Sequence, residues 1–153
     1  MPRTSLVPFA PEHAQALRLR PRARTALRGL PPLAELAAAY AAAGPAWTLL
    51  DGGAPLACGG AVRFWPGVGE LWCWAAEGAD EHPVAFARCA RKLVDALARK
   101  QGFHRLQAHV READMQAQGF ARFLGLSCEG RCEGYGADQS THLLYGRFYG
   151  WKA

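Results

Sequence analysis

A segment with the order strand, loop, helix, strand occupies the middle of the chain and constrains the fold most. Strand residues are predicted over 69–76, a loop over 77–83, an amphipathic helix over 84–101 and a second strand over 105–110. A crossover helix of this length places its two strands parallel in one sheet. The N–H groups at the start of such a helix face a crevice beside the strands, a favourable place for an anion such as phosphate.

Turn residues and hydrophobic periodicity predict the elements around this unit. Strands are expected over 4–9, 46–50, 55–64, 126–134 and 141–149, and helices over 11–17, 32–43 and 112–124. The segment 18–29 fits either a helix broken at Pro21 or a loop. The fold class is therefore α+β, with a mixed, mostly antiparallel sheet flanked by helices, in a single domain over residues 1–153.

The composition is that of a globular protein in a reducing compartment. Half of the residues are apolar and a fifth are charged. No apolar run approaches the roughly 20 residues of a membrane span, and the N-terminus lacks the apolar core of a signal peptide. We therefore expect a cytoplasmic or virion-interior location and no membrane partner. The five cysteines are expected to be buried free thiols, and Cys128 and Cys132 are too isolated to indicate a metal site.

Two short motifs accompany this order of elements. The first is the strand Pro55-Leu56-Ala57-Cys58-Gly59-Gly60, and the second is the helix end Phe120-Ala121-Arg122-Phe123-Leu124-Gly125-Leu126. Together with the topology, they resemble the GCN5-related N-acetyltransferase (GNAT) superfamily over nearly the whole chain. The resemblance implies an acyl-CoA N-acyltransferase fold, acetyl-CoA or another acyl-CoA as the cofactor, and a small-molecule or protein amine as the acceptor.

The resemblance also implies where the cofactor would lie. Its pantetheine arm would bond to the end of the strand, and its pyrophosphate would lie on the N–H groups of the loop and helix start. The residues concerned are Trp74, Ala75, Ala76, Gly78, Ala79, His82, Val84 and Ala85. The family's phosphate-loop pattern is missing here, and Glu77, Asp80 and Glu81 stand in its place. Each such charge near a pyrophosphate costs about 1 kcal/mol or more unless it turns away.

Candidate catalytic residues lie on the two strands of the central unit. Glu70 is a candidate general base for the amine acceptor, or simply an exposed carboxylate at a strand edge. His109 is a candidate proton relay, or a histidine on the sheet surface. The position of the family's acidic tyrosine falls on Ala121, and Tyr135 and Tyr145 are candidates to replace it.

A basic cluster of Arg18, Arg20, Arg22, Arg24 and Arg28 carries much of the net charge of +5. Such a cluster contacts nucleic acid, CoA phosphates or an acidic partner, or it is a solvated face. No aromatic residues alternate with these arginines, so the solvated face is favoured and nucleic acid is not an expected partner.

Two functions remain open from the sequence. The first is an acetyl-CoA-dependent N-acyltransferase of unknown acceptor, of phage or prophage origin. The alternative is a non-catalytic structural or interaction protein, similar to a phage internal virion protein branch that retains the acetyltransferase fold. Trp65, Trp72 and Trp74 fit either an acceptor pocket or an interface, so a homo-oligomer or a virion partner is an expectation of the second reading.

Overall fold

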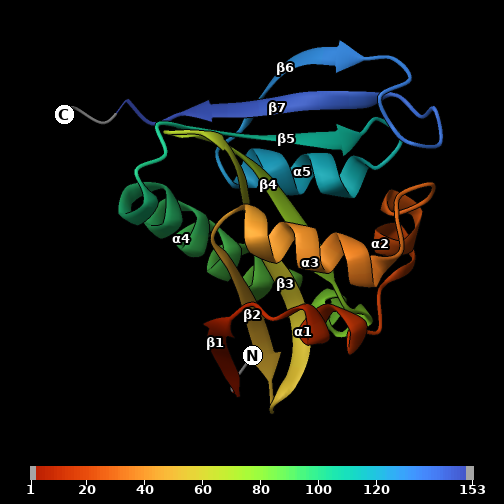
Figure 1. Ribbon diagram of the computed structural model, residues 1–153, viewed down its shortest axis with the longest axis vertical. Coiled ribbons are helices and arrows are strands. Elements are labelled where there is room, and N and C mark those ends of the chain that lie inside the picture. Colours follow the sequence, from red (N-terminus) through yellow and green to blue (C-terminus); the bar gives the residue numbers. More distant parts are fainter. Residues whose placement is uncertain (1–2, 151–153) are drawn as a thin grey trace. The chain divides into compact units, whose positions relative to one another are not determined.

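The computed structural model describes residues 3–150, which form two compact units. The first unit holds the residues up to Val62 together with Trp72–Phe86, and the second holds Arg63–Leu71 and the residues from Ala87 onward. The strands are β1 (Thr4–Pro8), β2 (Ala46–Asp51), β3 (Ala54–Trp65), β4 (Val68–Ala75), β5 (Arg105–Arg111), β6 (Ser127–Cys132) and β7 (His142–Phe148). Within the described residues they make one sheet in the order β1-β2-β3-β4-β5-β7-β6, and β3 and β4 contribute to both units (Figure 1).

The first unit packs short helices against β2, β3 and the end of β4. Its helices are α1 (Pro11–Gln15), α2 (Pro21–Ala26), α3 (Leu33–Ala43) and the 3-10 helix η1 (Glu77–Glu81). Strands β1 and β2 and strands β2 and β3 pair antiparallel. Apolar side chains of α1, α3, β3 and β4 form its core, namely Ala14, Leu17, Leu36, Ala37, Cys58, Trp74 and Ala76. The strands predicted over 46–50 and 55–64 are confirmed as the antiparallel pair β2 and β3, and the segment 18–29 contains helix α2.

The glycine pair of the first motif has a structural reason in this unit. A Cβ atom on Gly60 would lie 2.7 Å from the Cα of Ala46, and closer still to the carbonyl oxygen of Pro45. A Cβ atom on Gly59 would lie 3.0 Å from the carbonyl oxygen of Trp72. The neighbouring chain segments on both sides of β3 therefore lie too close to leave free room for side chains at Gly59 and Gly60.

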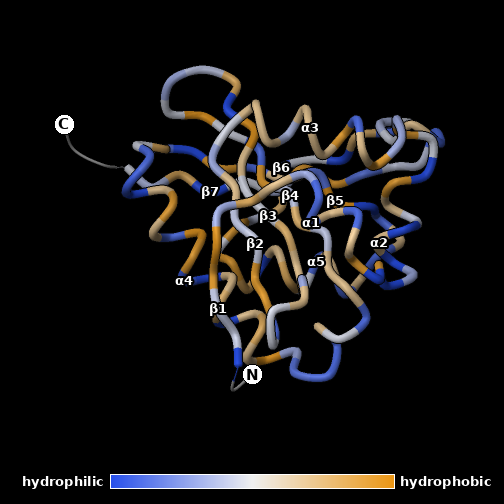
Figure 2. Tube along the Cα trace, turned by 60° about the horizontal axis from the view of Figure 1, so that its bottom comes forward, coloured by the Kyte–Doolittle hydropathy of each residue, from blue (hydrophilic) through white to orange (hydrophobic). Residues whose placement is uncertain are grey.

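The second unit packs two helices on one face of β5 and β7. Most of α4 (Pro83–Gln101) and all of α5 (Met115–Phe123) belong to it. Ala90 and Val94 of α4 pack with Ala121, Leu124 and the buried Tyr145, and α5 lies against β5 in Figure 1. Hydrophobic and hydrophilic residues alternate along α4 in Figure 2, as an amphipathic helix requires. The mixed α+β prediction is confirmed.

The pairing of β4 with β5 is parallel, as the central unit predicts. Val68 pairs with Arg105, Gly69 with Leu106 and Glu70 with Gln107. The antiparallel pairs β5–β7 and β6–β7 complete this part of the sheet. No helix among residues 3–150 is both long and apolar enough to cross a membrane.

Three local predictions were wrong. Helix α5 begins at Met115 instead of at residue 112, because the Asp114 carboxylate accepts a hydrogen bond from the Ala117 N–H at 3.0 Å and caps the helix there. The predicted loop 77–83 is largely the 3-10 helix η1. All five cysteines are free, but only Cys58 is buried, whereas Cys73 and Cys128 are exposed.

Candidate active site

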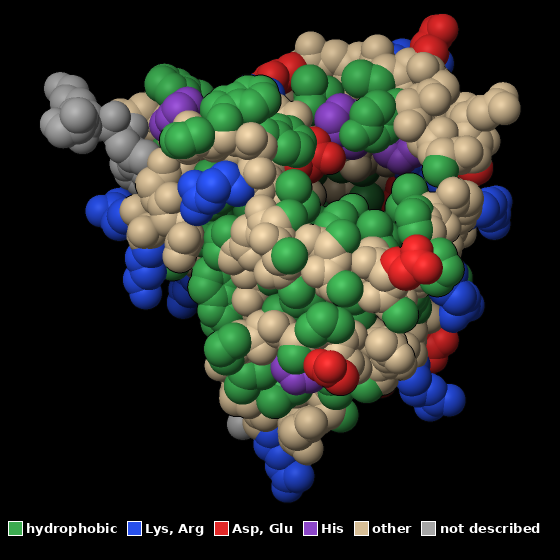
Figure 3. All heavy atoms as spheres, viewed as in Figure 1, with side chains coloured by type: hydrophobic (Ala, Val, Ile, Leu, Met, Phe, Trp, Pro, Cys, Tyr) green, Lys and Arg blue, Asp and Glu red, His purple; other side chains and the backbone are tan. Residues whose placement is uncertain are grey.

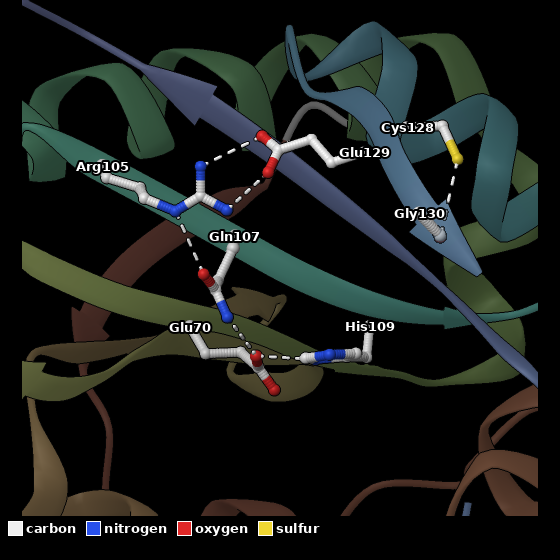
Figure 4. Close-up of polar contacts among 7 residues, drawn as sticks. All are labelled: Glu70, Arg105, Gln107, His109, Cys128, Glu129 and Gly130. Carbon is white, nitrogen blue, oxygen red and sulfur yellow. Dashed lines mark hydrogen bonds and ion pairs between the residues drawn. The ribbon is translucent and has the colours of Figure 1, made fainter. Parts of the chain in front are cut away.

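Glu70 and His109 lie in contact within the second unit. The parallel register places Glu70 beside Gln107, and side chains two residues apart on a strand share one face, so His109 lies on the same face. The Nδ1 atom of His109 is 2.8 Å from the Oε1 atom of Glu70, and both side chains are mostly buried (Figure 4). The two predicted catalytic residues are therefore neighbours, which the sequence alone did not establish.

A chain of hydrogen bonds extends from Glu70 to Glu129 (Figure 4). The Gln107 amide nitrogen donates to Glu70 Oε1 at 3.2 Å, and the Gln107 carbonyl oxygen accepts from Arg105 Nε at 3.1 Å. The Arg105 guanidinium in turn donates to both oxygens of Glu129, at 2.8 and 3.0 Å. This bidentate pair lowers the pKa of Glu129 and raises that of Arg105.

Backbone features of β6 and β7 make room for the Arg105–Glu129 pair. The register of β6 shifts between Cys128 and Gly130, and this irregularity is centred on Glu129. A Cβ atom on Gly146 of β7 would lie 2.8 Å from both the Glu129 carboxyl carbon and an Arg105 nitrogen. Because Gly146 has no side chain, the Arg105–Glu129 ion pair can lie over β7 at this position.

These hydrogen bonds indicate which nitrogen of His109 carries the proton when Glu70 is an ionised carboxylate. An arginine Nε–H only donates, so the Gln107 atom facing Arg105 is the carbonyl oxygen and its NH₂ group faces Glu70. Glu70 Oε1 thus accepts a hydrogen bond from Gln107, and an ionised carboxylate accepts the second one from His109 as well. His109 then carries its proton on Nδ1, and in the neutral ring Nε2 keeps a lone pair that can accept a proton.

The loop between β6 and β7 places Tyr135 over the imidazole ring. The rings of Tyr135 and His109 are stacked, with centroids 3.9 Å apart and planes 11° apart, and Tyr135 is half exposed. Asp138 orders this loop, since its carboxylate accepts from the Ser140 hydroxyl at 2.5 Å and from Arg111 at 3.0 Å, and these bonds hold its pKa well below the usual range. Figure 3 shows histidine and acidic side chains gathered among hydrophobic ones on one face.

Ala121, at the position of the family's acidic tyrosine, and Tyr145, the other candidate to replace that acid, are both buried. Ala121 is buried in α5 and provides no acidic group. Tyr145 is buried, and its hydroxyl donates to Gln118 at 3.3 Å and accepts from Arg122 at 3.1 Å. Tyr145 is therefore occupied in the packing of α5 against β7, and Tyr135 is the tyrosine that contacts the Glu70–His109 pair.

The predicted cofactor-binding residues lie in the first unit, at the end of β4 and the start of α4. The side chains of Trp74, Ala75, Ala76 and Ala79 are buried, that of His82 is exposed, and Val84 and Ala85 are exposed beside it. The Phe86 N–H donates to the His82 carbonyl at 3.0 Å, so the N–H groups of Val84 and Ala85 belong to the first turn, which the helix itself leaves unpaired. Gly78 lies within η1, whose fold differs from an open phosphate loop.

The arginine-bearing segment is attached to the end of β4. Leu19 forms an antiparallel bridge with Ala76, the Arg20 N–H donates to the Ala75 carbonyl at 3.2 Å, and the Glu77 N–H donates to the Arg18 carbonyl at 3.0 Å. These bonds bring the basic cluster beside the acidic 3-10 helix. Sequence reasoning did not detect this contact, because it joins segments almost 60 residues apart.

The acidic residues of η1 meet arginines from this segment. Arg20 lies 2.8 Å and Arg22 lies 4.0 Å from the same Asp80 oxygen. A shallow depression of about 440 Å³ that is open to solvent, here called the cavity, is lined by Leu17, Arg18, Leu19, Arg24 and Glu77. The segment and η1 together carry four arginines, at positions 18, 20, 22 and 24, and three carboxylates, at positions 77, 80 and 81. This excess of positive charge favours an anion.

Solved structures share this fold over nearly their whole length. The chain superposes on ribosomal-protein-S5-alanine acetyltransferase from Vibrio fischeri with a TM-score of 0.73, 15% identity and coverage of 99% of this chain and 96% of that one. Ard1 from Thermoplasma volcanium gives a TM-score of 0.73, 16% identity and coverage of 95% and 97%. The chain has the GNAT fold.

A third structure was solved with a cofactor. The protein yncA from Salmonella typhimurium, solved with acetyl-CoA, matches with a TM-score of 0.73, 12% identity and coverage of 98% of this chain and 96% of that one. No protein-family model and no curated protein matches the chain. At these identities the likeness shows the fold, and the activity must be argued from the residues.

Gln107, Arg105 and Glu129 are the functional candidates that sequence reasoning missed. Alternation along β5 places Arg105, Gln107 and His109 on one face, and that pattern was available in the sequence. The position of Glu129 could not be predicted from the sequence, because it depends on the pairing of β6 with β7. Within residues 3–150, no group of three or more metal-ligating side chains is assembled.

Proposed function

We propose that this protein is an acetyl-CoA-dependent N-acyltransferase in which His109 Nε2 is the general base. The observation that carries the proposal is the 2.8 Å contact between His109 Nδ1 and a Glu70 oxygen that also accepts from Gln107. The GNAT fold of the solved structures supports the reaction class. Glu70 then acts as the positioning residue, whereas the sequence made it a candidate for the base.

The residues have separate roles in this reaction. A bound acyl-CoA supplies a thioester whose acyl carbon is attacked and whose thiol leaves. His109 Nε2 takes a proton from the amine acceptor as the new C–N bond forms, which keeps the amine nucleophilic. The Glu70 carboxylate stabilises the imidazolium that results, and Tyr135 holds the ring plane by stacking. The imidazolium would then return this proton, directly or through water, to the thiolate released when the C–S bond breaks, so that the free thiol departs and His109 is neutral again.

The direct test is calorimetric titration with acetyl-CoA at low salt, followed by turnover with a panel of amines. We expect micromolar binding and acetylation of at least one amine, detected by chromatography of acetyl-CoA and CoA. A thiol reagent is unsuitable as the readout because Cys73 and Cys128 are exposed. Absence of binding at millimolar acetyl-CoA would contradict the proposal.

One observation favours the non-catalytic alternative. Phe64, Trp65 and Phe148 of the second unit are exposed large aromatic residues, and such residues are enriched at protein interfaces. A structural or virion component would form a defined oligomer or complex and would bind no acetyl-CoA. Sedimentation velocity, run on the same preparation as the titration, separates the two functions.

Gln107→Leu should lower kcat about tenfold and leave KM for acetyl-CoA unchanged. The variant removes the donor that holds Glu70, so the carboxylate and the His109 tautomer are less well fixed, at the cost of about one hydrogen bond to a charged group. Steady-state kinetics measure the effect. Gln116→Leu, at an exposed position of α5, is the matched control and should behave as the wild type. Equal kinetics for the two variants would exclude a positioning role for Gln107.

A further inference from the structure

The cavity of the first unit presents two arginines whose side chains are not used by the Asp80 ion pairs. Arg18 and Arg24 line it together with Leu17, Leu19 and Glu77. We propose that Arg18 and Arg24 bind the phosphate groups of the acyl-CoA donor, in place of the missing phosphate loop. This inference rests on the proposed function and adds binding residues from a segment that the resemblance does not assign to the cofactor.

The segment that carries these arginines is held firmly beside η1. Two backbone hydrogen bonds and the Leu19–Ala76 bridge fix residues 18–20 against the end of β4. Arg24 Nη1 donates to the Leu19 carbonyl at 2.6 Å, which holds its side chain over the same segment. A guanidinium has five N–H donors, so Arg24 keeps donors for a ligand after making this bond. The backbone of this segment and the Arg24 side chain are therefore fixed beside η1.

The charges at this place favour an anion. Arg20 and Arg22 neutralise Asp80, so this carboxylate is directed to the protein's own arginines. Inside the cavity, the two charges of Arg18 and Arg24 face the single charge of Glu77. The coulombic cost expected from the acidic loop is therefore offset from another segment.

The cavity is a shallow depression that is open to solvent, and a charged phosphate group tolerates such a place better than an apolar ligand does. Phosphate groups bind guanidinium forks strongly because two parallel N–H···O bonds can form. Nucleic acid offers the same phosphate chemistry, but the cluster lacks interleaved aromatic residues, so we argue for the cofactor and include nucleic acid as an outcome of the test.

The experiment measures Kd by calorimetry for acetyl-CoA and for acetyl-pantetheine, which lacks the phosphates. The combined variant Arg18→Gln, Arg24→Gln should weaken acetyl-CoA binding about fivefold to twentyfold and leave acetyl-pantetheine binding unchanged. Glu77→Gln should tighten acetyl-CoA binding about twofold to fivefold, because it removes the opposing charge from the cavity. These changes in Kd are measured by calorimetry and do not depend on enzymatic turnover.

Matched variants separate specific contacts from general basicity and from misfolding. Arg28→Gln removes an exposed charge of the same cluster outside the cavity lining and should leave Kd unchanged. Arg24→Lys keeps the charge and should retain most of the affinity, and circular dichroism checks that each variant is folded.

The outcomes distinguish this inference from the proposed function. If the wild type binds acetyl-CoA and the combined variant binds it equally well, or loses no more than Arg28→Gln does, the assignment of Arg18 and Arg24 is overturned while the proposed function stands. Tighter binding of a single-stranded oligonucleotide that the same variants abolish would also overturn it. If the wild type binds no acetyl-CoA, the proposed function fails and the inference fails with it.

Discussion

His109→Gln should lower kcat/KM for acetyl transfer about 10²–10⁴-fold, the usual contribution of a general base. The variant removes the Nε2 lone pair but keeps a polar side chain of similar length next to Glu70 and Tyr135. The binding of acetyl-CoA should change little, because the predicted cofactor-binding residues lie in the first unit. Kinetics with a saturating amine and calorimetry on the same protein measure the two effects separately.

Glu70→Gln distinguishes the two possible bases. The neutral side chain keeps a carbonyl oxygen that can accept from both Gln107 and His109, but it no longer stabilises an imidazolium. If His109 is the base, we expect a loss of about 10–100-fold, smaller than that of His109→Gln. A loss from Glu70→Gln that exceeds the loss from His109→Gln would assign the base to Glu70 instead. His104→Gln, at an exposed histidine just before β5, is the control and should retain full activity.

The sequence predicted the elements that carry the candidate site because those elements have strong local signals. The alternation in β4 and β5 and the amphipathic helix between them follow from hydrophobic periodicity. A helix that connects two neighbouring strands of one sheet makes those strands parallel, as β4 and β5 are. Once that pairing is known, Glu70, Gln107 and His109 share one face. The sequence therefore held the candidate pair Glu70 and His109, although it could not show that their side chains touch.

The parts that escaped prediction depend on pairing between distant segments. Glu129 reaches Arg105 only because β6 pairs with β7 through a register shift at that residue, and a single sequence does not specify such a shift. The bridge of Leu19 to Ala76 is a contact of the same kind. It changes the interpretation of the arginine cluster, since Arg20 and Arg22 bind Asp80 and do not simply face solvent.

Phe103→Ala should have the largest effect on stability. Phe103 lies between α4 and β5, its side chain is fully buried, and the Arg63 guanidinium lies 4.4 Å from its ring centre. Truncation of a buried phenylalanine leaves a cavity and costs about 3–5 kcal/mol in the free energy of unfolding. For a chain of this length, this corresponds to a fall of about 6–20 °C in Tm, measured by circular dichroism. Phe148→Ala, at a phenylalanine that is 74% exposed in the same unit, should change Tm by less than about 2 °C.

The same variant tests the prediction of a single domain over residues 1–153. Phe103 belongs to the second unit, whereas in a Trp65→Phe, Trp151→Phe background the remaining tryptophans, Trp47, Trp72 and Trp74, report on the first unit by fluorescence. In a single cooperative domain, the transitions seen by fluorescence and by circular dichroism coincide and shift together in Phe103→Ala. Cooperative unfolding is expected because the backbones of β3 and β4 continue from one unit into the other. A fluorescence transition that keeps the wild-type Tm while circular dichroism shifts would show that the two units unfold independently.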